Sequence, residues 1–171
     1  INQKKLSIKN NKLYKLEVFF DLKTKLVSIS KKIPKNKMFN NKYPYKSSMS
    51  MTMTKSFKKL HKDIIKDFDP KLFLEIGSND GALIKNFTKN KAICVEPCNN
   101  LAKITSKLGY KTYPNYWDRN LAKKIKKKYG NVDVVYAANT ITHIADLENV
   151  FKSIFNVLSQ NGILIIEDPS L

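Results

Sequence analysis

The stretch Leu74-Glu75-Ile76-Gly77-Ser78-Asn79-Asp80-Gly81 indicates the fold of this 171-residue chain more than any other segment. It runs as an apolar strand and continues into a turn bracketed by two glycines, which we expect to open a helix. Glycines at the carboxyl end of a parallel strand let the backbone pass close to a ligand, and the first N–H groups of the next helix face it. The stretch therefore predicts a site for a nucleoside-type ligand.

The spacing of the glycines narrows the class of ligand. The turn reads G-x-x-x-G, whereas dinucleotide sites use G-x-G-x-x-G, so a smaller and less anionic ligand such as S-adenosylmethionine fits better. The next apolar run ends at Glu96, where the second strand of a nucleotide-binding fold holds the two ribose hydroxyls. Glu96 and Glu75 could also be solvated charges at strand ends.

From Lys71 onwards, strand and helix patterns alternate. Strands are expected near residues 72–76, 92–96, 110–113, 132–138 and 162–167, with helices between them. This order predicts an α/β domain with a mostly parallel, Rossmann-like sheet. The last apolar run leaves an open edge, which is a liability for a sheet.

The first forty residues follow another pattern. Alternating stretches at Leu13–Phe20 and Leu26–Ile29 predict a small β-hairpin, and Lys31–Lys42 is expected to be a linker. A hydroxyl-rich loop then leads into an amphipathic helix, which Ser47 or Ser48 could cap. We expect three parts: residues 1–42 (hairpin and linker), 43–70 (hydroxyl-rich loop and helix) and 71–171 (cofactor-binding α/β domain).

The composition sets limits on partners and location. The formal charge is +18, yet Arg119 is the only arginine and the lysines are spread along the chain, so compositional bias explains the charge better than a nucleic-acid footprint. An anionic small substrate suits this charge. No apolar run is long enough to cross a bilayer and no signal peptide is recognisable, so a cytoplasmic location is expected. Cys94 and Cys98 are expected to be free thiols without metal.

Several motifs, taken in order, resemble the S-adenosylmethionine-dependent sugar C-methyltransferases, which methylate nucleotide-linked deoxysugars. The resemblance covers roughly residues 13–171, and the combination is far more specific than any one motif. The motifs are Tyr43-Pro-Tyr45-x-Ser47-Ser48-x-Ser50-x-Thr52-Met53, the stretch from Leu74 to Gly81, Val95-Glu96-Pro97, Ala138-Asn139, His143-Ile-x-Asp146-Leu147 and Glu167-Asp-Pro169.

The resemblance implies a class I methyltransferase sheet and a role for each matching residue. Tyr45 and His143 are the candidate catalytic residues, although Tyr45 could be a packed aromatic and His143 a core histidine. Tyr43, Ser47 and Ser48 would contact the nucleotide-linked sugar. The residues expected to bind S-adenosylmethionine are Glu75, Gly77, Ser78, Asn79, Asp80, Gly81, Glu96, Pro97 and Asn139.

The chain departs from the family pattern in two places. Where the family has a Cys-x-x-Cys zinc pair, this chain reads Asp21-Leu-Lys-Thr24, so we expect no structural zinc. The family's catalytic Glu-His pair and its last two strands follow the fifth strand, and the chain is expected to be truncated there and before Ile1. A non-catalytic or partner-dependent fragment is therefore one alternative function, and a nucleic-acid methyltransferase is another. The oligomeric state stays open.

Overall fold

The computed structural model describes residues 14–30 and 33–168, and it divides the chain into two compact units, Ile1–Met38 and Phe39–Leu171. The predicted start of the hairpin at Leu13, the start of the linker at Lys31 and the motif residue Pro169 lie outside the described residues. Each unit is described by itself below.

The first unit contains the predicted hairpin. Strand β1 (Val18–Phe20) pairs antiparallel with β2 (Val27–Ile29). Asp21 forms the turn, because its Oδ1 accepts the N–H groups of Lys23 and Thr24 at 2.8 and 2.7 Å. The hairpin prediction is confirmed, while the expected linker contains a short helix, α1 (Lys35–Met38).

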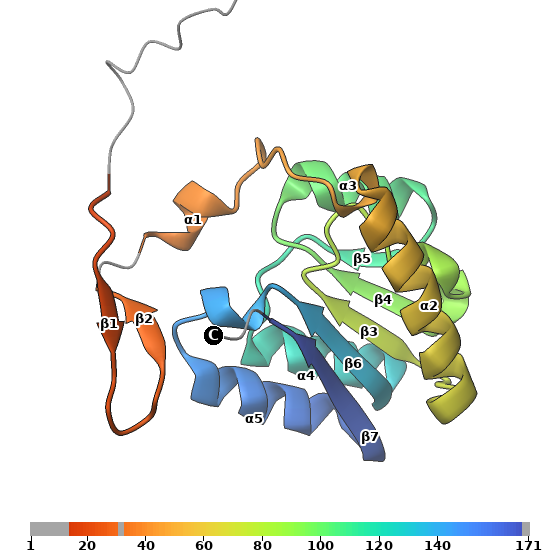
Figure 1. Ribbon diagram of the computed structural model, residues 1–171. Helices are drawn as coiled ribbons and strands as arrows, with labels where there is room; N and C mark the ends of the chain where they lie inside the picture. The colour runs from red at the N-terminus through yellow and green to blue at the C-terminus, as the bar shows by residue number, and fades with distance from the viewer. Residues whose placement is uncertain (1–13, 31–32, 169–171) are drawn as a thin grey trace, which may run out of the picture. The chain divides into compact units, whose positions relative to one another are not determined.

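The second unit contains a five-stranded sheet of order β5-β4-β3-β6-β7, with every neighbouring pair parallel. Figure 1 shows the sheet between two layers of helices. The prediction of a Rossmann-like α/β fold is confirmed. The strands are β3 (Phe73–Ile76), β4 (Ala92–Val95), β5 (Lys111–Tyr113), β6 (Val132–Ala138) and β7 (Leu158–Glu167).

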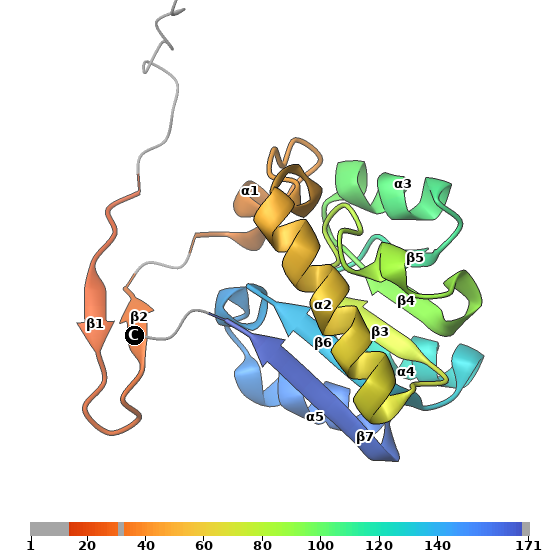
Figure 2. The same cartoon turned by 45° about the vertical axis from the view of Figure 1, so that its right-hand side comes forward.

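Helices cover both faces of this sheet. Figures 1 and 2 show α2 and α3 on one face and α4 and α5 on the other. Ser50 caps α2, since its side chain accepts the Met53 N–H, so capping by Ser47 or Ser48 was wrong. The helices are α2 (Met51–Phe68), α3 (Asn99–Lys107), α4 (Arg119–Tyr129) and α5 (Leu147–Val157). Short 3₁₀ turns are η2 (Ser47–Met49), η3 (Ile84–Asn86), η4 (Lys89–Lys91) and η5 (Ile141–His143).

The core consists of two apolar clusters, one on each face of the sheet. Successive side chains of a strand point to opposite faces. In β3, Leu74 and Ile76 join the cluster against α4 and α5, whereas Phe73 joins the cluster against α2. A strand buried on both faces therefore reads as a continuous apolar run, which is why β3 and β6 were readable from the sequence.

The segment after the glycine turn differs from the prediction. We expected an α-helix to begin at Gly81, but only the 3₁₀ turns η3 and η4 lie before β4. Asn86 explains the early end, because its side-chain amide donates to the Leu83 carbonyl at 2.8 Å and so takes a carbonyl that a helix would use. The site therefore lacks the N-terminus of a long helix at this position.

Strand β7 begins earlier than expected, directly after α5. Val132 of β6 pairs with Leu158 of β7, and Val134 pairs with Ile163. The register therefore shifts between these two pairs, and the shift accommodates the additional residues of β7. Among the described residues, β7 pairs only with β6. None of the helices described is long and apolar enough to span a membrane.

Candidate cofactor and substrate site

The turn after β3 is a tight glycine turn fixed to the neighbouring strand. Gly77 and Gly81 have φ angles of +78° and +83°, a region that favours glycine. The N–H groups of Gly77 and Ser78 both donate to the Val95 carbonyl, at 2.8 and 3.2 Å. A Cβ atom at Gly77 would overlap the Thr140 hydroxyl, so the turn after β3 lies against the loop after β6.

The N–H groups of this turn are used within the protein. Asn79 N–H donates to Glu96 Oε2 at 2.8 Å, Asp80 N–H to the Asn79 side chain at 2.8 Å, and Gly81 N–H to the Ser78 carbonyl at 2.9 Å. Phosphate-binding turns instead leave such donors for the ligand. The geometry therefore disfavours a dinucleotide, as the glycine spacing predicted.

The site is acidic although the chain as a whole is basic. Glu75, Asp80 and Glu96 are 5%, 7% and 4% exposed, and none of them forms an ion pair among the described residues. Burial raises the pKa of Glu75 well above its ordinary range, and the nearby Glu96 raises it further. Glu75 Oε2 is buried and lacks a hydrogen-bond partner. Buried carboxylates without a counter-charge suit a ligand that brings cations or hydroxyl donors.

Glu96 lies at the end of β4, where the sequence placed it. Its two oxygens accept the N–H groups of Asn79 and Cys98, at 2.8 and 2.7 Å. These bonds lower the pKa of Glu96, but desolvation by burial is the larger effect and raises it. Pro97, the next residue, is half-buried. Each carboxylate oxygen keeps a further lone pair, so Glu96 can still accept two ligand hydroxyls.

The predicted substrate-side segment lies against the glycine turn. Ser47 N–H donates to Asn79 Oδ1 at 3.0 Å, and Ser48 N–H donates to Asp80 Oδ1 at 3.2 Å. The Ser48 hydroxyl also bonds to Asp80 Oδ2. The structure therefore brings Ser47 and Ser48 together with the predicted cofactor residues.

The two tyrosines of this segment lie differently. Tyr43 is half-buried, and its pKa is raised by desolvation and by the charges of Cys98 and Glu96 nearby. Tyr45 is 48% exposed, and its hydroxyl donates to Met53 Sδ at 2.9 Å. Tyr45 is therefore neither a buried aromatic nor bonded through its hydroxyl to the turn, although its carbonyl accepts the Asn79 side chain at 3.4 Å.

The loop after β6 holds the remaining predicted residues. Asn139 has a φ of +47°, and its N–H donates to the Glu167 carbonyl at 2.7 Å. His143 is exposed rather than in the core, and its ring meets the Phe39 ring edge-on at 5.3 Å. Both residues lie at the carboxyl end of the sheet, as expected for neighbours of β3.

Three contributors to the site are not among the predicted site residues. Phe39 reaches His143, and its carbonyl accepts the Tyr116 hydroxyl at 2.8 Å. Thr140 packs against Gly77, and Asn100 donates through its side chain to the Tyr43 carbonyl at 2.9 Å. Only Thr140 lay beside a predicted motif residue, so it alone had a usable signal.

The described residues contain no group of three or more His, Cys, Asp or Glu side chains able to hold a metal ion. Cys94 and Cys98 are both buried free thiols, and desolvation by burial raises the pKa of each to about 12. Neither thiol is therefore a ready nucleophile at neutral pH.

A sequence model of the family described as "Methyltransferase domain" matches residues 49–171. No curated protein matches the chain. Solved structures do resemble the second unit's architecture, and all those named below are less than a quarter identical in sequence, so they bear on the fold alone.

The plantazolicin methyltransferase BpumL, solved with a triazolic desmethylPZN analog and SAH, has a TM-score of 0.53 and 15% identity, with 70% of this chain and 48% of that chain covered. The plantazolicin methyltransferase BamL, solved with a triazolic desmethylPZN analog and SAH, has a TM-score of 0.52 and 14% identity, with 67% of this chain and 46% of that chain covered. A methyltransferase from Thermotoga maritima, described as a possible histamine N-methyltransferase, has a TM-score of 0.48 and 22% identity, with 66% of this chain and 50% of that chain covered. The chain thus spans half of the length of these proteins or less.

Proposed function

Because the chain belongs to the methyltransferase-domain family, we propose that it binds S-adenosylmethionine and transfers its methyl group to a carbon atom of a nucleotide-linked deoxysugar. The cofactor expected from the family is also the one whose product form, SAH, was crystallised with the plantazolicin methyltransferases. The acceptor is a narrower proposal, which rests on the motifs shared with sugar C-methyltransferases.

One observation carries the proposal for the cofactor: buried carboxylates without a counter-charge surround a glycine turn. S-adenosylmethionine carries a sulfonium cation, an ammonium group and two ribose hydroxyls. Asp80 supplies a carboxylate beside the turn, and Glu75 supplies a buried carboxyl oxygen that lacks a hydrogen-bond partner. Glu96 offers free lone pairs at the position of a ribose ligand. A dinucleotide would bring additional negative charge into the same place.

The remaining predicted residues take roles that follow from their positions. Gly77, Ser78 and Gly81 allow close approach of the cofactor, while Asn79 joins the turn to Glu96 and to Ser47. Asn139 and Pro97 border the site from the neighbouring strand ends. The bound cofactor supplies an activated methyl group, which a substrate nucleophile attacks directly.

The acceptor is expected on the side of residues 43–48 and His143. Ser48, Tyr43 and Tyr45 offer hydroxyls for a sugar, and exposed His143 offers a nitrogen within reach of solvent and acceptor. Carbon methylation next to a keto group requires removal of a proton from that carbon. His143 is the candidate base and Tyr45 the candidate partner for the keto oxygen.

The test is transfer of a radioactive methyl group from S-adenosylmethionine to a thymidine-diphosphate-linked 4-keto-deoxysugar, followed by mass spectrometry of the product. We expect incorporation on carbon, with a loss of about 10²–10⁴-fold in His143→Gln if His143 is the base. Methylation of an oligonucleotide instead would support the nucleic-acid alternative. Cofactor binding without transfer to any acceptor would support a non-catalytic or partner-dependent fragment.

A further inference from the structure

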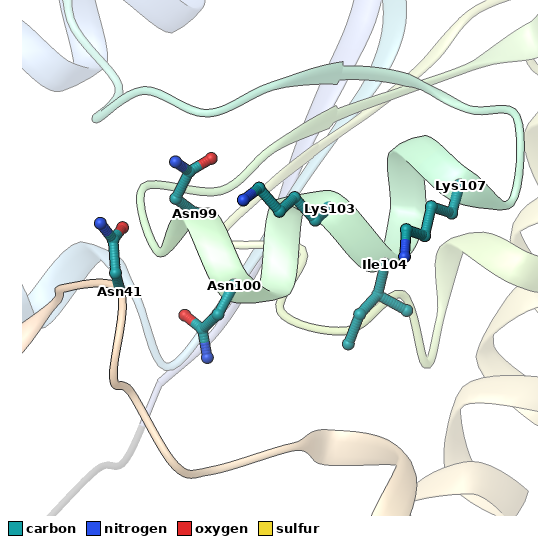
Figure 3. A pocket seen from close by; sticks show the side chains of 6 residues that line it. All are labelled: Asn41, Asn99, Asn100, Lys103, Ile104 and Lys107. Atoms are coloured by element: carbon teal, nitrogen blue, oxygen red, sulfur yellow. The ribbon is translucent and has the colours of Figure 1, made fainter.

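A pocket lies along α3, next to Asn41. Its volume is about 340 Å³, and three asparagines, two lysines and one isoleucine line it. Figure 3 shows Asn41 opposite the start of α3, with the other side chains following along the helix. We call it the α3 pocket; its residues are Asn41, Asn99, Asn100, Lys103, Ile104 and Lys107.

The charges of the α3 pocket are all of one sign. Lys103 and Lys107 line it and no carboxylate does. The ion pairs of the described residues lie elsewhere, between Lys15 and Glu17, Lys59 and Asp63, and Lys152 and Glu148. Two ammonium groups without an acidic partner, in a concave site of this size, favour an anionic small ligand.

The spacing of the polar groups indicates the kind of anion. Lys103 and Lys107 are one helical turn apart, so their stems start about 5–6 Å from each other on one face of the helix. Two neighbouring phosphate groups can therefore contact both lysines at once. The amides of Asn41 and Asn99 add donors and acceptors suited to sugar hydroxyls or a base.

The pocket also shares a wall with the proposed acceptor site. Asn100 lines the pocket, and its side chain donates to the Tyr43 carbonyl at 2.9 Å. We propose that the α3 pocket binds the diphosphate group of a nucleoside diphosphate, the anionic part of the methyl acceptor. This assignment of the ligand rests on the proposed function, whereas the pocket itself does not.

The experiment is calorimetric titration of the full chain with uridine diphosphate, and with inorganic pyrophosphate, uridine and a single-stranded oligonucleotide as comparison ligands. The test variant is Lys103→Gln/Lys107→Gln. The matched control is Lys123→Gln/Lys127→Gln, which removes the same charge at the same spacing from exposed positions of α4. Equal thermal unfolding midpoints would show that both variants fold.

We expect uridine diphosphate to bind the wild type and the control alike, and to bind the test variant about tenfold or more weakly. Equal weakening in both variants, or none in the test variant, would overturn the proposal. Pyrophosphate binding through the same lysines is also expected from a diphosphate site. Uridine alone, or the oligonucleotide through the same lysines, binding as tightly as uridine diphosphate would overturn the choice of ligand. Titration of the wild type with S-adenosylmethionine in parallel distinguishes failure of the proposed function from failure of the α3 pocket. If the chain binds uridine diphosphate through the two lysines but does not bind S-adenosylmethionine, the proposed function is refuted and the anion site of the α3 pocket is not.

Discussion

Ser48 bonds to Asp80 through both its N–H and its hydroxyl, and so joins the segment before α2 to the glycine turn after β3. Ser47 makes a parallel contact with Asn79 at 3.0 Å. The two segments are 32 residues apart in sequence. The predicted acceptor side and the predicted cofactor side of the site are therefore physically continuous.

Removing the Ser48 hydroxyl tests this continuity. Ser48→Ala leaves the N–H bond in place and deletes the hydroxyl bond to the carboxylate, so we expect the free energy of unfolding to fall by about 1 kcal/mol. Urea denaturation measures the change. Ser56→Ala, at an exposed position of α2, is the control. A Ser48→Ala variant as stable as this control would show that the bond contributes nothing.

The contact between Gly77 and Thr140 predicts a large penalty for a side chain at Gly77. Gly77→Ala suffers both from the positive φ and from overlap with the Thr140 hydroxyl. Gly109→Ala is the matched control, because its φ is +90° but its Cβ would meet only the end of the Lys89 side chain at ordinary distance. The φ effect alone costs about 1–2 kcal/mol.

We therefore expect Gly77→Ala to lose more stability than Gly109→Ala in urea denaturation, and Gly77→Ala/Thr140→Ala to regain part of the difference. Similar losses in the two single variants would mean that the overlap with Thr140 is relieved without cost, and that the two loops do not constrain each other.

Glu75 predicts a pH dependence of stability. Its pKa is raised in the folded state, so folding takes up a proton and the stabilisation is complete below the ordinary value of 4.5. As the pH rises towards the folded pKa, the unfolded state loses its proton first and the folded state becomes less stable. Glu75→Gln carries no titrating proton, so its stability relative to wild type should rise between pH 4.5 and pH 8.

Urea denaturation at the two pH values measures this difference, with Glu148→Gln on the exposed side of α5 as the control. The control should show no such divergence. A constant gap between Glu75→Gln and wild type would contradict a buried, protonated carboxyl at this position. A residual slope in the variant is expected from Glu96, whose pKa is also raised.

The two thiols should be unreactive in the folded chain. Burial raises the pKa of Cys94 and of Cys98 to about 12, so the thiolate is scarce at pH 8. We expect an aromatic disulfide reagent to modify neither thiol in the native protein and both in guanidinium chloride. Fast modification of the native chain, absent in Cys98→Ser, would show that the loop after β4 opens.

The sequence was most informative where local pattern and final environment agree. The apolar runs of β3 and β6 are buried on both faces, so composition alone revealed them, and Glu96 follows directly from the end of β4. The segment after Gly81 was misread because the Asn86 amide takes a backbone carbonyl, a choice made by one side chain rather than by periodicity.

The long-range contacts of the site could not be predicted from the sequence, because local patterns do not encode them. Nothing near Phe39 signals that its ring meets His143, since the two are brought together only when the chain crosses the carboxyl edge of the sheet. Ser47 and Ser48 were linked to the site by resemblance, whereas their actual partners, Asn79 and Asp80, required the fold.

The most direct test of the account is calorimetric titration of the chain with S-adenosylmethionine, using Glu96→Gln and the control Glu148→Gln. We predict one saturable site, weakened about tenfold or more in Glu96→Gln, which loses charge and acceptor capacity at the proposed ribose ligand, and unchanged in the control. A folded wild type that does not bind, or a Glu96→Gln variant that binds as tightly as wild type, would contradict the assignment of this site.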